Sequence, residues 1–228
     1  FAGKSLSYRA THQPGRKDLS TMLKLVIGDR NFSSWSLRPW LAMKQAGLPF
    51  EEINIRLDSP GTKADIYKHS PSGNVPCLID GETVVWDSLA ICEYIAETVP
   101  ALWPEDRKAR AEARSISAEM HSGFGALRHA MPMNIRASTP YKKHQAYVIS
   151  DIARLTAIWE SCRSRYGKDG PFLFGKFSIA DAMFAPVVWR FQTYAVELPP
   201  VSRAWVETIR TLPAMEEWRA SALAEPER

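Results

Sequence analysis

Short strand-like and helix-like runs alternate along residues 22–99. The compact apolar run 23–27 predicts a strand. Residues 36–46 predict a helix that ends at Gly47, because glycine is a common C-terminal helix stop. Apolar and polar residues then alternate along 53–57, which is the period of a strand. The first three elements are therefore expected in the order β-α-β.

A hairpin and another helix are expected next. After a loop rich in Pro, Ser and Gly at 70–76, the apolar runs 77–79 and 83–86 flank Asp80-Gly81, a dipeptide typical of hairpin turns. Residues 88–97 predict a helix. The N-terminal unit thus has the order β-α-β followed by β-β-α, and its last two strands are antiparallel.

The chain changes character near residue 103. Beyond it the strand signals stop, and apolar residues recur every three or four positions, the period of a helix. Two long helical faces are indicated by these positions: Ala113, Ile116, Met120, Phe124, Leu127 and Met131, and then Val148, Ile152, Leu155, Trp159, Cys162 and Tyr166. Further helices are expected at 179–194 and 205–212. We predict an α/β domain at 22–102 and an all-α domain at 103–228.

The composition adds limits on the class of protein. Of 228 residues, 45% are hydrophobic and 24% charged, which excludes collagen-like, low-complexity and wholly disordered chains. No run approaches the roughly 18 apolar residues of a membrane span, so no membrane partner is expected.

The net charge of +4 is unevenly distributed. Residues 1–21 hold four basic residues and one acidic residue, a net +3, which leaves +1 for the rest. This segment lacks a sustained apolar period. We expect a disordered leader that is vector-derived, mis-assigned or an organellar transit segment. A structured basic stripe for nucleic acid is not expected.

The three cysteines, Cys77, Cys92 and Cys162, form no CxxC pair and accompany no paired histidine spacing. This pattern favours neither a disulfide scaffold nor a zinc site, so no metal is expected. A reducing, cytoplasmic environment fits it best. Cys77 and Cys92 are expected to be small buried apolar residues.

The string NFSSWSLR at residues 31–38 lies between the first strand and the first helix. It places Ser33 and Ser34 near a helix N-terminus, which presents unpaired N–H groups and about half a unit of positive charge. A serine hydroxyl there can donate to a bound thiolate, whose parent thiol has a pKa of about 8.5. Ordinary N-capping by serine is the alternative.

Val75-Pro76 leads directly into the strand at 77–79. Proline belongs at the first residues of a strand, because it cannot donate to the ladder. If this bond is cis, the Val75 N–H and C=O turn outward and can pair with an extended peptide. Most X-Pro bonds are trans, so the sequence leaves both isomers open.

Asp87-Ser88 stands between the strand at 83–86 and the next helix. A carboxylate, a hydroxyl and free backbone donors in one place suit the ammonium and carboxylate groups of an amino acid. Helix capping is again the alternative. In a β-α-β-β-α unit, both helix starts and the proline-led strand can lie at one edge of the sheet. The three strings can therefore form one site.

Taken in this order, the motifs from residue 22 to the C-terminus resemble a cytosolic glutathione transferase. Val75-Pro76 is similar to the cis-proline element of that family's thioredoxin-like domain, and Asp87-Ser88 to its acidic-Ser pair for the γ-glutamyl group. The string SSWSLR is similar to the zeta-class pattern SSCSxR. The string FSIAD at 177–181 matches the folding signature of the helical domain, with Ser178 and Asp181 as reciprocal caps.

The resemblance implies glutathione as co-substrate, with no metal. Val75 would pair with its cysteinyl backbone, and His69 or Asn74 would help anchor the peptide. Ser33 and Ser34 are both candidates for the sulfur-facing hydroxyl. The acceptor pocket is expected partly at Arg128, Met131 and Arg136, where apolar walls would hold a hydrophobic electrophile and arginines would suit an anionic one. Core packing is the alternative for the methionines.

A glutathione transferase acting on a small, largely hydrophobic electrophile is the favoured interpretation. The alternatives are a glutathione-dependent isomerase or dehalogenase, and a non-catalytic binding or assembly module. Trp35 stands where zeta enzymes place cysteine, which weakens the case for maleylacetoacetate isomerisation. Without that cysteine, thiol-disulfide exchange is not expected either. The family also implies a homodimer.

Overall fold

The computed structural model describes residues 22–140 and 145–226, so the leader expected at 1–21 lies outside the described residues. The described chain forms a four-stranded sheet in the order β2-β1-β3-β4. Its strands are β1 (Leu23–Gly28), β2 (Phe50–Ile55), β3 (Cys77–Asp80) and β4 (Thr83–Trp86). Strand β1 is parallel to β2 and antiparallel to β3, and β3 and β4 form the predicted hairpin.

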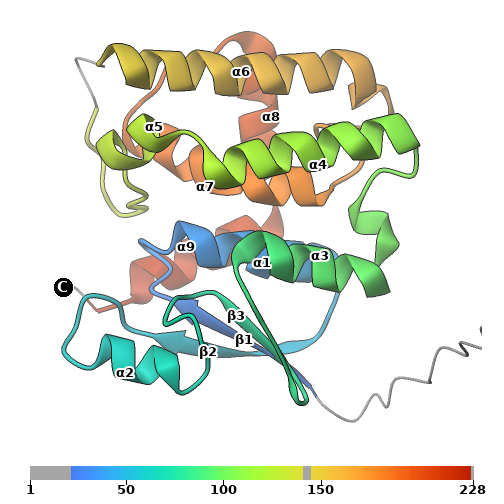
Figure 1. Ribbon diagram of the computed structural model, residues 1–228. Coiled ribbons are helices and arrows are strands. Elements are labelled where there is room, and N and C mark those ends of the chain that lie inside the picture. Colours follow the sequence, from blue (N-terminus) through green and yellow to red (C-terminus); the bar gives the residue numbers. More distant parts are fainter. Residues whose placement is uncertain (1–21, 141–144, 227–228) are drawn as a thin grey trace, which may run out of the picture.

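Helices cover both faces of this sheet and then form the second half of the chain. They are α1 (Ser34–Gln45), α2 (Thr62–Tyr67), α3 (Ser88–Thr98), α4 (Arg107–Ser122), α5 (Gly125–Ala130), α6 (Ala146–Tyr166), α7 (Ile179–Thr193), α8 (Pro200–Arg210) and α9 (Pro213–Ala224). Two short 3-10 turns follow α3 and α6, at Pro100–Leu102 and Gly167–Asp169. Helices α1 and α3 lie on the side of the sheet that faces the helical half, and α2 lies on the other side (Figure 1).

The predicted fold class is confirmed, with three local differences. The helix expected at 205–212 is α8, which ends at Arg210, and α9 was not predicted. Helix α2 was not predicted, because Ile66 is its one buried residue and it shows little apolar periodicity. The first long helical face is interrupted between α4 and α5. Phe124 there has a left-handed φ of 61°, and a Cβ on Gly123 would lie 2.8 Å from the Glu119 carbonyl oxygen. The apolar period continues across this break because both helices bury residues in the same core.

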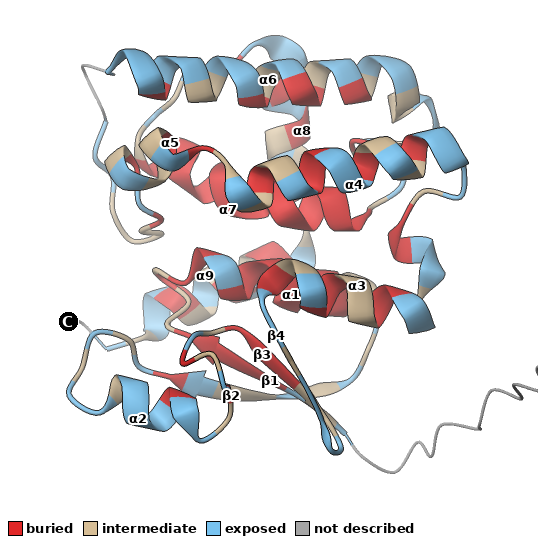
Figure 2. Ribbon diagram, in the orientation of Figure 1, coloured by how far each residue is buried: buried red, intermediate tan, exposed pale blue. Residues whose placement is uncertain are grey.

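Buried residues gather in the layer between the sheet and the helical half (Figure 2). Helix α7 is buried along nearly its whole length, and it begins with the predicted capping box of Ser178 and Asp181. Helix α9 returns to the N-terminal half and lies beside α1, where the Trp218 and Trp40 rings meet edge to face with centroids 5.0 Å apart. The Trp218 indole N–H also donates to the Arg30 carbonyl at 2.9 Å, which ties α9 to the loop before α1, where the candidate serines lie.

Candidate functional site

Two adjoining pockets meet at Trp35, Asn74 and Val75. One has a volume of about 370 Å³ and reaches the start of α3. The other has a volume of about 420 Å³ and reaches the start of α2. The α3-side pocket is also lined by Ser72, Pro76, Trp86, Asp87, Ser88 and His121. The α2-side pocket is also lined by Phe32, Ser33, Leu57, Asp58, Thr62, Lys63, Ile66 and Gly73. Together they form a groove across one end of the sheet, beyond the last residues of β1, β2 and β4 and before the first residue of β3.

Val75 lies at the middle of this groove. The Val75-Pro76 bond is cis, which answers the question that the sequence left open. Within the described residues, neither the N–H nor the C=O of Val75 has a hydrogen-bond partner. Asn74 is exposed beside it and borders both pockets. A half-buried residue with an unpaired N–H and C=O is an edge onto which an extended peptide can add.

Asp87 caps the helix start with one carboxylate oxygen and turns the other toward the pocket. Its Oδ1 accepts from the N–H groups of Leu89 and Ala90 at 2.9 and 3.1 Å, while Oδ2 lies 3.1 Å from Nε2 of His121 in α4. Its φ is 79°, a left-handed value that costs a non-glycine residue about 1 kcal/mol. The capping alternative is therefore realised by one carboxylate oxygen, and the other faces the pocket. Strained backbone of this kind is common at ligand sites.

Ser88 follows as the first residue of α3, with its side chain buried. Its N–H has no acceptor among the described residues, as expected in the first turn of a helix. Its Oγ accepts a hydrogen bond from Nη1 of Arg38 at 3.3 Å. Ser88 therefore offers two donors to a ligand, its backbone N–H and its own hydroxyl proton.

The two candidate serines have different surroundings. Ser33 borders the α2-side pocket, makes no side-chain cap, and donates from Oγ to Ser36 Oγ at 2.7 Å. Ser36 in turn accepts from the Gly28 N–H at 3.1 Å. Ser34 lines neither pocket, and its Oγ accepts from Nη2 of Arg190 in α7 at 3.2 Å. The side-chain capping alternative is thus not realised at Ser33.

Trp35 is held between two guanidinium groups. The Cζ atoms of Arg38 and Arg128 lie 4.3 and 4.8 Å from its ring centroid, and His121 meets it edge to face at 5.2 Å. Burial, together with the repelling charge of Arg128, lowers the pKa of Arg38 to about 9 and that of Arg190 to about 10. Burial also lowers the pKa of His121, which Asp87 partly opposes. The site therefore has a surplus of positive charge.

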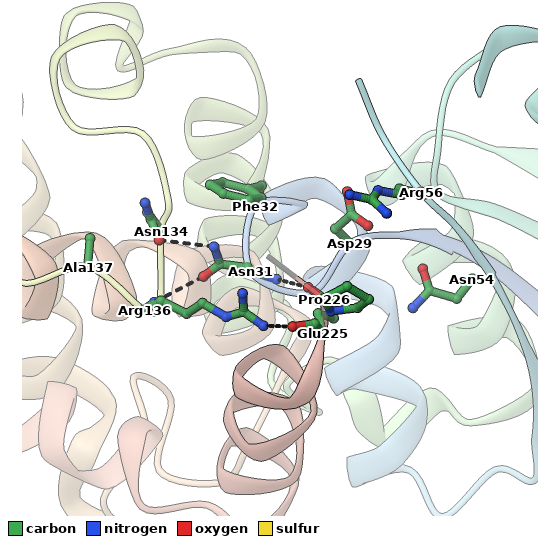
Figure 3. A pocket seen from close by; sticks show the side chains of 10 residues that line it. All are labelled: Asp29, Asn31, Phe32, Asn54, Arg56, Asn134, Arg136, Ala137, Glu225 and Pro226. Carbon is green, nitrogen blue, oxygen red and sulfur yellow. Dashed lines mark hydrogen bonds between the residues drawn. The ribbon is translucent and has the colours of Figure 1, made fainter. Parts of the chain in front are cut away.

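A third pocket, of about 520 Å³, lies beyond Phe32, which it shares with the α2-side pocket. Arg136 lines it, but its guanidinium donates to the carbonyls of Ala222, Leu223 and Glu225 and is held by the C-terminal segment (Figure 3). Asn31 bridges the two halves there, since its side chain binds the Asn134 amide oxygen and the Arg136 N–H. This pocket lies between the β1–α1 loop and the helical half.

Not every predicted residue reaches a pocket. Met131 is fully buried in the hydrophobic core, so its side chain does not line an acceptor pocket, and the packing alternative describes it. Arg128 contacts Trp35 and donates to the Gly123 and Met120 carbonyls. His69 lines none of these three pockets.

Three residues at the site were not among the predicted ones: Arg38, His121 and Arg190. Arg38 ends the string NFSSWSLR, in which only the serines were assigned a role. His121 lies among the helical positions 113–131, where only the apolar residues were used. Arg190 lies in the last turn of a helix that is buried nearly throughout, and no local pattern connects it with Ser34. A charged residue in such an apolar helix is unusual, and this was the one feature of the sequence that could have marked Arg190 as a candidate.

The cysteines take no part in the site. Cys77, Cys92 and Cys162 are free and buried, and burial raises the pKa of each thiol. In the described ranges no three His, Cys, Asp or Glu side chains cluster as a metal site would require. Across the same ranges, no helix combines the length and apolar character needed to cross a bilayer.

Comparison with known proteins adds independent findings. Residues 32–98 match the glutathione S-transferase N-terminal domain, and residues 118–221 match the glutathione S-transferase C-terminal domain. Maleylacetoacetate isomerase from Mus musculus is 31% identical over 75% of this chain and 79% of that protein. A stringent starvation protein A homologue from Coxiella burnetii is 24% identical over 79% of this chain and 81% of that protein.

Solved structures agree on the fold. A glutathione transferase homologue from Burkholderia, crystallised with bound glutathione, superposes with a TM-score of 0.67. It covers 90% of this chain and 100% of that chain at 23% identity. At that identity the likeness concerns the fold.

Proposed function

Since the chain belongs to the glutathione S-transferase family, we propose that its groove binds glutathione and activates the thiol for attack on an electrophile. The observation that carries this proposal is the unpaired backbone of Val75 at the junction of two pockets. A tripeptide paired there through its central residue would extend one end into each pocket. The arrangement accounts for both pockets with a single ligand.

The two pockets differ in a way that suits the two ends of glutathione. On the α3 side, Asp87 offers a carboxylate oxygen to an ammonium group, and Ser88 offers two donors to a carboxylate. On the α2 side, Lys63 lies at the wall and donates from Nζ to the Gly73 carbonyl at 2.5 Å. Its charge suits the glycyl carboxylate. The γ-glutamyl end is therefore assigned to α3 and the glycyl end to α2.

We assign to Ser33 the contact with the glutathione sulfur, because Ser33 borders the groove. The hydroxyl of Ser34 is bonded to Arg190 instead, and Ser34 does not line the groove. Ser36 has a proton of its own, so Ser33 can turn its proton from Ser36 to a thiolate. The N–H of Trp35, in the first turn of α1, has no acceptor among the described residues and adds to this positive end. A shift of two pKa units requires about 2.7 kcal/mol, which one hydrogen bond and a helix end can supply.

The reaction follows from these positions. The thiol releases its proton to solvent, and the thiolate lone pair forms a C–S bond with the electrophile while the leaving group departs with its bonding electrons. The pocket beyond Phe32 is the proposed place for the acceptor. The helix end and the hydroxyl need no movement to stabilise the sulfur, which is the condition for electrostatic catalysis.

Glutathione-dependent isomerisation is a second candidate, and the 31% identity to a mouse maleylacetoacetate isomerase favours it. Here the thiolate would add to the substrate and leave again, so glutathione is regenerated. Incubation with glutathione and a panel of electrophiles and cis-enone acids separates the two. Glutathione consumed in a conjugate supports transfer, and unchanged glutathione with an isomerised product supports isomerisation. Binding without either reaction favours a binding module.

The sulfur assignment is tested by Ser33→Ala with Ser34→Ala as the matched control. We expect Ser33→Ala to raise the pKa of bound glutathione by about one to two units, with less than threefold loss of affinity. Ser34→Ala should shift it by less than about half a unit. The measurement is a pH titration of thiolate ultraviolet absorbance. The reverse result would assign the stabilisation of the thiolate to Ser34. An unchanged thiol pKa in both variants would show that neither serine stabilises the thiolate.

A homodimer and a cytoplasmic location are also proposed, on the family alone. Sedimentation velocity of the purified chain tests the first. A sedimentation coefficient that matches the 25.7 kDa monomer at micromolar concentration would count against it.

A further inference from the structure

Arg38 is a buried cation bonded to Ser88, which lines the α3-side pocket. Its side chain is 0% exposed and lies against one face of Trp35. Among the described residues it forms no salt bridge, and its Nε and Nη2 atoms are buried without a hydrogen-bond partner. Its one hydrogen bond runs from Nη1 to Ser88 Oγ, at 3.3 Å. The guanidinium thus uses one contact where it has five donors.

Such a group destabilises the empty protein. A buried charge without a counter-ion costs free energy, and an apolar residue of similar volume is often neutral or stabilising in its place. The surrounding charges increase the cost, because Arg128 and Arg190 both repel Arg38 while Asp87 attracts it weakly. A buried, unsatisfied donor of this kind requires an explanation in ligand binding or strain.

We propose that Arg38 is the positioning residue for the ligand carboxylate at Ser88. This inference rests on the proposed function and concerns the γ-glutamyl end of glutathione. Because Arg38 donates to Ser88 Oγ, the single hydroxyl proton of Ser88 points away from the guanidinium and is available to a ligand in the pocket that Ser88 lines. With the free Ser88 N–H it forms a two-donor seat for a carboxylate.

The same carboxylate supplies the negative charge that Arg38 lacks. Glutathione bound at Ser88 would place its γ-glutamyl α-carboxylate one hydroxyl group from the guanidinium, so that the charge is balanced through Ser88. Arg38 does not touch the ligand in this arrangement. Its effect therefore depends on the ligand carboxylate and on the Ser88 hydroxyl, and both dependences can be measured.

The experiment pairs protein variants with two ligands, glutathione and the analogue γ-aminobutyryl-cysteinyl-glycine, which lacks only the γ-glutamyl α-carboxylate. The variants are Arg38→Met and Arg38→Lys, with Arg110→Met as the matched control. Arg110 donates to the carbonyls of Pro104 and Glu105 and lines none of the three pockets described above. Affinities are measured by calorimetry on the full chain, and thermal unfolding is followed in parallel.

We expect Arg38→Met to weaken glutathione binding about tenfold or more and analogue binding less than twofold. Arg38→Lys should retain part of the preference for glutathione over the analogue, and Arg110→Met should retain all of that preference. In a Ser88→Ala background, Arg38→Met should change glutathione affinity less than about threefold, since the hydrogen bond from Arg38 to the Ser88 hydroxyl is already lost. Arg38→Met is expected to unfold at the wild-type temperature or above it.

Three results would overturn the inference. They are an equal loss for both ligands, an unchanged preference for glutathione in Arg38→Met, and loss of the folded state in both Arg38 variants, which would make the residue a core element. Failure of the proposed function looks different, because the wild-type protein would then bind neither ligand.

Discussion

The helix starts of α3 and α7 each use an aspartate, and the two side chains have different roles. Asp181, in the first turn of α7, is 0% exposed and accepts four hydrogen bonds. Its donors are the N–H groups of Leu173 and Ser178, the Ser178 hydroxyl and the Trp205 indole N–H, at 2.9 to 3.1 Å. Asp87, before α3, is exposed and accepts from two N–H groups with one oxygen only.

The comparison shows how one residue type serves stability or binding. A carboxylate whose oxygens are filled by the protein has nothing left to offer a ligand, and it ties a loop, a helix start and a neighbouring helix together. Asp87 keeps the helix start in place with one oxygen, and its second oxygen, beside His121, lies at the pocket where a ligand ammonium can reach it. Burial raises the pKa of Asp181, and its four donors oppose that rise.

The largest expected effect is on stability at Asp181. Asp181→Asn turns an amide NH₂ toward donors and leaves buried groups unpaired, so the free energy of unfolding should fall by about 3 kcal/mol. Glutathione affinity of the folded fraction should not change. Urea unfolding and calorimetry measure the two. A loss below about 0.5 kcal/mol would contradict the structural role, since surface substitutions have effects of that size.

The matched change at Asp87 should have the opposite signature. Asp87→Asn keeps a capping oxygen and tolerates the left-handed φ, so stability should change by less than about 0.5 kcal/mol. It removes the charge that would face the ligand ammonium, and glutathione affinity should fall about tenfold. If Asp87→Asn lost stability and kept affinity, Asp87 would be a structural residue like Asp181.

The smallest expected effect concerns the open side of Asp87. His121 lies 3.1 Å from its Oδ2, and burial keeps the pKa of His121 below the ordinary value of 6.5. Arg38 and Arg128 lower that pKa further, whereas Asp87 raises it. The imidazole is therefore neutral at pH 7.5 and gains a proton only below pH 6.5. Once charged, it competes with the ligand ammonium for Asp87.

We expect glutathione affinity to fall about threefold between pH 7.5 and 5.5, a modest effect because the pair is partly exposed. His121→Gln should flatten this dependence. Binding titrations at the two pH values check it. An identical pH profile in the variant would show that His121 does not cause the pH dependence of glutathione affinity. A rise in affinity at low pH would contradict the expected direction of the effect.

Local patterns accounted for much of the site. The strings around Ser33, Val75 and Asp87 were identified because each lies at a strand–helix junction or before a strand, where short-range rules apply. Long-range partners could not be predicted in this way. Arg190 lies 156 residues from Ser34, and the hydrogen bond between them depends on how α7 packs across α1.

The sequence by itself determined the order of the four strands with α1 and α3, the hairpin at Asp80-Gly81 and the capping box of α7, because these depend on periodicity and on contacts a few residues apart. Tertiary structure alone decided that Arg38 lies buried behind Ser88, that Met131 faces the core, and that α9 returns to α1. The reason is that such contacts depend on how separate elements pack. Packing sums many weak contacts between distant residues, and no single stretch of sequence records that sum.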